Sequence, residues 1–277
     1  MSNKVILVIM DGVGYDTALS QCGYLEGMVE LGRAHRWKMR TALPTISAAM
    51  YETIHTGLSP LDHGVSGNEA LRRSIVPNVF DHLHQAGHST AAVAHSYFHT
   101  LYNGPYDPVE HVEVEDETKA IQYGRFYSME GYSAANICAP AEIDLCAQAT
   151  RLVRRHTPDY VLLHSSSVDS LGHKYTADSA QYRIQTWHID NALARTIPIW
   201  LEAGYDIFVT ADHGMNADGH HGGNEEIMRH VPFYYFGTAK VPEKDQLLDQ
   251  LAIAPTILSR IGADIPDNMK HKPLLQG

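Results

Sequence analysis

The sequence predicts an α/β fold in which a mainly parallel sheet carries helices on both faces. Short apolar runs alternate along the chain with longer segments of helical periodicity, which is typical of strands joined by crossover helices. The runs are apolar at nearly every position, as in strands that are buried on both faces. With 277 residues, of which 44% are hydrophobic and 19% charged, the chain has a globular composition and can enclose such a core.

Five segments are expected as strands and five as helices. The expected strands cover residues 4–12, 89–96, 159–169, 205–214 and 231–237, and the expected helices cover 47–57, 76–87, 139–156, 177–204 and 253–262. Residues 96–139 are the least periodic stretch, rich in tyrosine, glycine and proline, and are expected to be a small excursion from the sheet. No repeat or low-complexity linker divides the chain, so residues 1–277 are expected to form one domain.

Charge and composition limit the classes of partner. A net charge of −11 at pH 7 argues against nucleic acid, because binding its backbone requires a basic surface that displaces counterions. The apolar run at the amino terminus is too short to cross a bilayer, so neither a membrane anchor nor a signal peptide is expected. The three widely spaced cysteines, Cys22, Cys138 and Cys146, suit a reducing compartment, and a cytoplasmic protein is expected. The oligomeric state is left open.

Side chains of the kinds that bind metals follow three of the expected strands. They are Asp11 after the first strand, Asp169 and His173 after another, and Asp212 and His213 after a third. Because ligands of open parallel sheets bind beyond the carboxyl ends of the strands, groups from separate strands can converge there. The sequence therefore predicts a cluster of acids and histidines at this edge of the sheet.

A glycine-rich loop, GHHGG, adds His220 and His221 to this set. Carboxylates and imidazoles without cysteine fit zinc, or a harder divalent ion such as manganese, and the number of groups suits a pair of ions. Taken singly, the acids have simpler interpretations. Asp11 or Asp169 is also a common kind of helix cap, and Asp169 with His173 is also a common surface pair four residues apart on a helix.

The order of motifs along the chain resembles the alkaline phosphatase superfamily and, within it, the type I phosphodiesterase/nucleotide pyrophosphatase branch. The motifs are Asp11, PTIS, TGLSPLDHGVSGN, VDSLGH, TADHGM, HHGG and IAPTILSRIG, which together span almost the whole chain. The resemblance implies an alkaline-phosphatase-like three-layer sandwich that forms a single catalytic domain. It also implies two divalent metal ions, most often zinc, at the end of the sheet.

The resemblance further assigns ligands to each ion. The first set is Asp169, His173 and His221, and the second set, which meets the nucleophile Ser47, is Asp11, Asp212 and His213. His221 is preferred to His220 because the family histidine directly precedes the glycine pair.

Two hydroxyl residues, Thr45 and Ser47, follow Pro44 at the start of an expected helix. The family pattern matches the segment from Pro44 to Gly57 without a gap and implies that Ser47 is the nucleophile. Independently, a helix start offers free N–H groups and a favourable dipole to an anionic phosphoryl group. The alternative for Ser47 is an ordinary helix cap, and the side chain of Thr45 is expected to hydrogen bond locally.

Two further residues are candidates for substrate contact. The resemblance implies that Asn68 donates a hydrogen bond to a phosphate oxygen, and its alternative is an ordinary turn residue. Arg72 is suited to neutralise a phosphate or a substrate carboxylate, and its alternative is a solvated surface charge.

The expected function is metal-dependent hydrolysis of small phosphorylated substrates through a covalent phospho-serine at Ser47. Related phosphodiesterases that accept nucleotides carry a bulky aromatic residue after the nucleophile, whereas this chain has Ala48, so simple diesters are expected to be better substrates. The tyrosines of residues 96–139 offer another stacking surface. The alternatives are hydrolysis of phosphonates or phosphomonoesters, a phosphate mutase or transferase, and a metal-dependent binding protein without catalysis.

Overall fold

The computed structural model describes residues 4–129, 136–138 and 140–276. Its strands are β1 Lys4–Met10, β2 His35–Arg40, β3 Thr90–His95, β4 Glu113–Glu115, β5 Tyr123–Tyr127, β6 Tyr160–Ser165, β7 Tyr205–Thr210, β8 His230–Phe236 and β9 Leu248–Asp249. Its α-helices are α1 Tyr15–Gln21, α2 Gly23–Glu30, α3 Ser47–Thr56, α4 Pro60–His63, α5 Val79–Gln85, α6 Ser96–Tyr102, α7 Glu142–His156, α8 Ser167–Tyr175, α9 Ala180–Glu202, α10 Glu226–Arg229 and α11 Ile253–Ile261. Two short 3₁₀ helices are η1 Asn68–Ala70 and η2 Gln250–Ala252.

One mixed sheet holds the nine strands in the order β4-β5-β3-β6-β1-β7-β8-β2-β9. β1 pairs in parallel with β6 on one side and with β7 on the other, and β3 continues the parallel part beyond β6. β8 runs antiparallel to both β7 and β2. The five expected strands are β1, β3, β6, β7 and β8, so the mainly parallel α/β fold class is confirmed.

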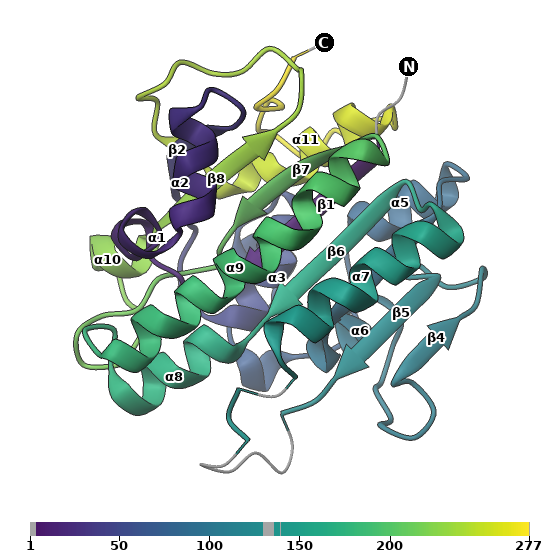
Figure 1. Ribbon diagram of the computed structural model, residues 1–277. Coiled ribbons are helices and arrows are strands. Elements are labelled where there is room, and N and C mark those ends of the chain that lie inside the picture. Colours follow the sequence, from purple (N-terminus) through teal and green to yellow (C-terminus); the bar gives the residue numbers. More distant parts are fainter. Residues whose placement is uncertain (1–3, 130–135, 139, 277) are drawn as a thin grey trace.

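Helices cover both faces of this sheet (Figure 1). On one face α7 packs on β6 and α9 packs on β7, with α8 against α9. On the other face α11 packs on β1 and α5 on β3, and α3 packs against both of these helices. Every residue of β3, β6 and β7 is buried, which explains why these strands are apolar runs rather than alternating patterns.

The described residues of the segment 96–139 differ from the expectation, because they include two strands that extend the sheet. They supply α6, and β5 pairs in parallel with β3 while β4 pairs antiparallel with β5 at the sheet edge. β5 alternates between buried and half-buried residues, so it lacks the continuous apolar run by which the central strands were recognised. Of the tyrosines in this segment, Tyr132 lies outside the described residues.

No helix in the described part of the chain is both long enough and apolar enough to cross a membrane.

The turn after β1 depends on a glycine. Gly12 has a φ of +78°, and a Cβ at this position would lie 2.9 Å from the Cα of Asp169 in α8. The Gly12 N–H also donates to Oδ1 of Asp212 at 3.1 Å. Only a residue without a side chain lets the end of β1 approach α8 this closely, and the approach brings Asp11 next to Asp169 and Asp212.

Gly12→Ala should therefore destabilise the protein more than the same change at Gly87. Gly87 has a φ of +80° but nothing within 4 Å of its Cβ position, so Gly87→Ala measures backbone strain alone, about 1–2 kcal/mol. Gly12→Ala should add about 1–3 kcal/mol for overpacking against α8. Urea unfolding of the two variants measures the difference, and equal losses would contradict the close approach.

Candidate active site

Three acids from neighbouring strands meet at the carboxyl edge of the sheet. Asp11 follows β1, Asp212 follows β7, and Asp169 lies in the first turn of α8, which follows β6. In each carboxylate one oxygen is buried and has no hydrogen-bond partner among the described residues, namely Asp11 Oδ1, Asp169 Oδ1 and Asp212 Oδ2. Buried carboxylate oxygens without donors are costly, so the arrangement calls for a positive charge between them.

The first cluster consists of Asp11, Asp212, His213 and Ser47. His213 Nε2 lies 3.2 Å from Asp212 Oδ2 and 3.5 Å from Asp11 Oδ1. The hydroxyl oxygen of Ser47 lies 3.3 Å from the same nitrogen. One ligand atom from each of Asp11, Asp212 and His213 lies within 4.8 Å of the others, which is the spacing of a group that can hold a metal ion.

The second cluster consists of Asp169, His173 and His221. The Nε2 atoms of the two histidines are 3.0 Å apart, and each lies 3.5 Å from an oxygen of Asp169. His221 also stacks on His213 of the first cluster, with ring centroids 3.8 Å apart. The two clusters therefore lie side by side, and Asp169, His213 and His221 form a further group within 4.8 Å. His220 is exposed and belongs to neither cluster.

The three histidines share one orientation. In His173, His213 and His221 the Nδ1 atom lies 2.9 Å, 3.1 Å and 2.7 Å, respectively, from a backbone carbonyl oxygen. A carbonyl only accepts, so Nδ1 carries the proton and Nε2 keeps its lone pair. Histidines that bind metals are held in this way, and here all three Nε2 atoms face the carboxylates.

Electrostatics also favour a cation. Burial and the charges of Asp11 and Asp169 raise the pKa of Asp212 well above its usual value. Burial and the charge of Asp11 raise the pKa of Asp169 as well. Burial and the neighbouring His221 lower the pKa of His213 to about 3, so its imidazole is neutral. A divalent ion would relieve the repulsion between these carboxylates and would bind the lone pairs of the neutral imidazoles. The residues present therefore fit such an ion.

Tyr51 and His164 hold the other oxygen of Asp11. The Tyr51 hydroxyl donates to Asp11 Oδ2, and His164 Nε2 lies 3.2 Å from the same oxygen. The hydroxyl oxygen of Tyr127, at the end of β5, lies 2.9 Å from His164 Nδ1. With Oδ2 occupied, Oδ1 is the oxygen of Asp11 that faces His213. No sequence motif indicates a role for Tyr51 or Tyr127, whereas His164 stands out as a histidine inside the apolar run of β6.

Ser47 is the first residue of α3 and is 7% exposed. The N-cap position of α3 is Ile46 and not Ser47, and among the described residues the Ser47 hydroxyl makes no capping hydrogen bond, so the interpretation of Ser47 as a cap finds no support. Asn68 Oδ1 accepts from the backbone N–H of Ala48 at 3.1 Å, which places Asn68 beside Ser47 and leaves its Nδ2 group free to donate.

Arg72 has a different environment. Its side chain is exposed and donates to the carbonyl oxygen of Ala70 at 3.4 Å. The contacts of the described residues do not join its guanidinium to either cluster, so substrate binding by Arg72 stays a prediction.

Thr45 connects the nucleophile segment to the loop that carries His221. Its hydroxyl accepts from the N–H of Gly222 at 2.8 Å and donates to the carbonyl oxygen of Gly223 at 3.1 Å. Its own carbonyl oxygen accepts from His221 Nδ1 at 2.7 Å. The side chain of Thr45 therefore bonds to a segment about 180 residues away rather than locally, and we infer that Thr45 positions His221.

Thr45→Val should loosen this loop, whereas Thr45→Ser should preserve it. Valine has the shape of threonine but leaves the half-buried Gly222 N–H without its partner, at a cost of about 1 kcal/mol of unfolding free energy. Calorimetric titration of each chelator-treated variant with zinc should show weaker binding for Thr45→Val and near-normal binding for Thr45→Ser. Identical behaviour of the two variants would contradict the positioning role.

Known proteins share this fold and parts of this sequence. The solved structure of murine ectonucleotide pyrophosphatase / phosphodiesterase 5 superposes with a TM-score of 0.70 at 13% identity, over 99% of this chain and 100% of that chain. An inactive variant of that protein has been solved in complex with AMP. At this identity the superposition shows a common fold alone.

Two curated relatives match by sequence. A 2,3-bisphosphoglycerate-independent phosphoglycerate mutase of Natronomonas pharaonis is 36% identical over 129 residues, which are 43% of this chain and 24% of the mutase. The catalytic subunit of GPI ethanolamine phosphate transferase 3 of Mus musculus is 21% identical over 288 residues, which are 95% of this chain and 25% of the transferase. The chain thus spans about a quarter of the length of these relatives.

The family profile described as type I phosphodiesterase / nucleotide pyrophosphatase matches residues 5–223. This span contains both clusters, together with Ser47 and Asn68. The chain therefore belongs to the type I phosphodiesterase / nucleotide pyrophosphatase family of the alkaline phosphatase superfamily.

Proposed function

We propose that this protein hydrolyses phosphate esters with Ser47 as nucleophile and two divalent metal ions as cofactors, zinc in first place and manganese as the alternative. The observation that carries the proposal is the position of the Ser47 hydroxyl, 3.3 Å from His213 Nε2 and next to buried carboxylate oxygens that lack donors. The family match supports an enzyme of the phosphoester hydrolase type.

The two clusters divide the metal ligands as the resemblance implies. One ion would be held by Asp11, Asp212, His213 and Ser47, and the other by Asp169, His173 and His221. When bound, such ions supply positive charge that stabilises phosphoryl oxygens and favours the deprotonated form of a hydroxyl. The uniform Nδ1 bonding of the three histidines supports this assignment, because it leaves every Nε2 available.

The chain's own residues then account for two chemical steps. Ser47 Oγ, having lost its proton to solvent, forms a bond to phosphorus while the bond from phosphorus to the leaving-group oxygen breaks, and the leaving group departs as an alcohol after protonation. Water then attacks the phosphorus of the phospho-serine, breaks its bond to Ser47 Oγ and releases the product phosphate. Asn68 would stabilise a phosphoryl oxygen through its Nδ2 group, since its Oδ1 already accepts from the N–H of Ala48 in the first turn of α3.

Ser47→Ala should lower the rate of diester hydrolysis by about three orders of magnitude or more, because it removes the attacking atom. Ser179→Ala is the matched control, since Ser179 does cap a helix, by accepting from the N–H of Tyr182 at 3.1 Å. That control should lose about 1 kcal/mol of unfolding free energy and keep its rate. Initial rates with bis(p-nitrophenyl) phosphate, and mass spectrometry of acid-quenched phosphopeptides, measure the outcome. A phosphoryl label on Thr45 would contradict the assignment.

We propose small, simple diesters as the preferred substrates. Ala48 is fully buried and has no ring to stack on a nucleobase, and its N–H is engaged by Asn68. We therefore expect kcat/KM for bis(p-nitrophenyl) phosphate, a simple diester, to exceed that for a p-nitrophenyl ester of a nucleotide. A panel that adds phosphomonoesters and phosphonate monoesters tests the alternative hydrolase activities. A strong nucleotide preference would contradict the role of Ala48 and would point to Tyr127 and its neighbours as a stacking surface.

Phosphoryl transfer to an alcohol is the second candidate, and the similarity to a mutase and to a phosphate transferase favours it. In that case a substrate hydroxyl, rather than water, would take the phosphoryl group from Ser47. The ratio of alkyl phosphate to free phosphate formed from an aryl phosphate in added glycerol separates the two reactions. Predominant transfer would favour the second candidate, and predominant phosphate release favours hydrolysis.

A further inference from the structure

We propose that the groove between α7 and α9 is a second binding site, for a free organic anion that carries its charged headgroup on a short apolar body. The apolar residues that line this groove are Ile143 and Ala147 of α7 and Ile199 of α9, and the buried Thr150 and Thr196 line it as well. Four arginines complete the lining, Arg151, Arg154 and Arg155 of α7 and Arg195 of α9. The two helices lie next to each other on the outer face of the sheet (Figure 1).

The charge of this groove opposes that of the whole protein. The chain carries a net charge of −11, yet no acidic residue is among those that line the four-arginine cavity. Arg155 lies 3.6 Å from Glu115 Oε1. Within the described part of the chain, Arg151, Arg154 and Arg195 form neither a hydrogen bond nor an ion pair through their side chains. Guanidinium groups gathered without counter-charges repel one another, and an anion between them would remove that repulsion.

The size and the apolar lining of the groove indicate what the ligand carries besides its anionic headgroup. Its volume is about 510 Å³, which is within the range of sites for small organic molecules, roughly 300–1,000 Å³, and exceeds the volume of one inorganic anion. Ile143, which lines the groove, is 41% exposed. A forked guanidinium binds planar or tetrahedral oxyanions through paired hydrogen bonds, and exposed apolar side chains can bind a hydrocarbon segment. The lining therefore fits a carboxylate, sulfonate or phosphate on an apolar chain.

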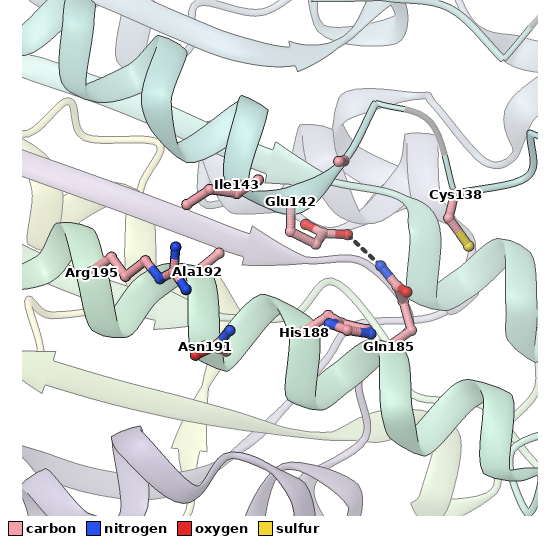
Figure 2. Close-up of a pocket in the computed structure, with 9 residues that line it drawn as sticks. Cys138, Glu142, Ile143, Gln185, His188, Asn191, Ala192 and Arg195 are labelled. Atoms are coloured by element: carbon pink, nitrogen blue, oxygen red, sulfur yellow. Dashed lines mark hydrogen bonds between the residues drawn. The ribbon is translucent and has the colours of Figure 1, made fainter.

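A neighbouring cavity of about 310 Å³ shares Ile143 and Arg195 with this groove (Figure 2). Glu142 lines that cavity, and its carboxylate is already engaged, since Oε1 accepts from Ser165 Oγ at 2.8 Å and from Gln185 Nε2 at 3.0 Å. Glu142 is buried, and the ion pairs of the described residues do not join it to the arginines of the groove. None of the residues lining either cavity belongs to the two acid and histidine clusters, so the groove is distinct from the candidate active site.

The test uses 1-octanesulfonate, an amphiphilic anion that contains no phosphate ester. Isothermal titration calorimetry of the full chain should show one bound equivalent per chain. The double variant Arg151→Gln/Arg195→Gln should bind at least tenfold more weakly, because α7 and α9 each lose one of the arginine charges that line the groove. Arg183→Gln is the matched control, since Arg183 is an exposed arginine of α9 outside the groove lining and should leave the affinity unchanged.

Two companion titrations and a vesicle-binding measurement make the proposal falsifiable. Methanesulfonate, which lacks the chain, and octyl glucoside, which lacks the charge, should each bind at least tenfold more weakly than 1-octanesulfonate. Unchanged far-ultraviolet circular dichroism and unchanged diester hydrolysis should show that the double variant is folded. Equal affinity of wild type and double variant, equal affinity for octyl glucoside, or no binding of 1-octanesulfonate would overturn the proposal. Binding to vesicles with anionic lipid, without binding of monomeric 1-octanesulfonate, would overturn it in favour of a membrane-facing surface.

Discussion

The mutual repulsion of three buried carboxylates is the constraint on which the rest of this structure depends. Asp11, Asp169 and Asp212 come from three adjacent elements of the sheet, and each keeps one buried oxygen without a donor. Burial and this repulsion raise the pKa of Asp169 and of Asp212. Such a group is stable in its charged form only around a cation, so the fold and its proposed cofactors are linked through the same side chains.

Helix α3 connects the nucleophile to this group. Ser47 begins the helix, and Tyr51, one turn later, donates to Asp11 on its far oxygen. Immediately before the helix, Thr45 holds the loop of His221. All ten residues of α3 are buried, which restricts its movement relative to the sheet. A single rigid element thus aligns Ser47 with ligands from both clusters, as a preorganised site requires.

The two faces of the sheet have different roles. The face that carries α3 and α11 supports Ser47, whereas the face that carries α7 and α9 exposes the arginine groove. Glu142 lies between the groove and the turn from β6 to α8, where it accepts from Ser165 and Ser167. The backbone oxygen of Ser165 in turn accepts from the N–H of Asp11 at 3.0 Å. These contacts connect the segment that carries Glu142, near the arginine groove, to the strand end that carries Asp11 in the candidate active site.

Local patterns in the sequence were sufficient for the central strands, for the acids that follow them and for the helix that begins at Ser47, because each depends on periodicity or spacing within a few residues. They were insufficient for β2, β4, β5 and β9, which are short or only half-buried. β2 depends on pairing with β8 and β9, which lie far away in the sequence, and β4 depends on pairing with β5 at the edge of the sheet. Likewise, only the tertiary structure decided that Thr45 bonds to Gly222 and that His164 supports Asp11. The physical reason is that hydrogen bonds between segments more than a hundred residues apart depend on strand order, here β6-β1-β7, which no local pattern encodes.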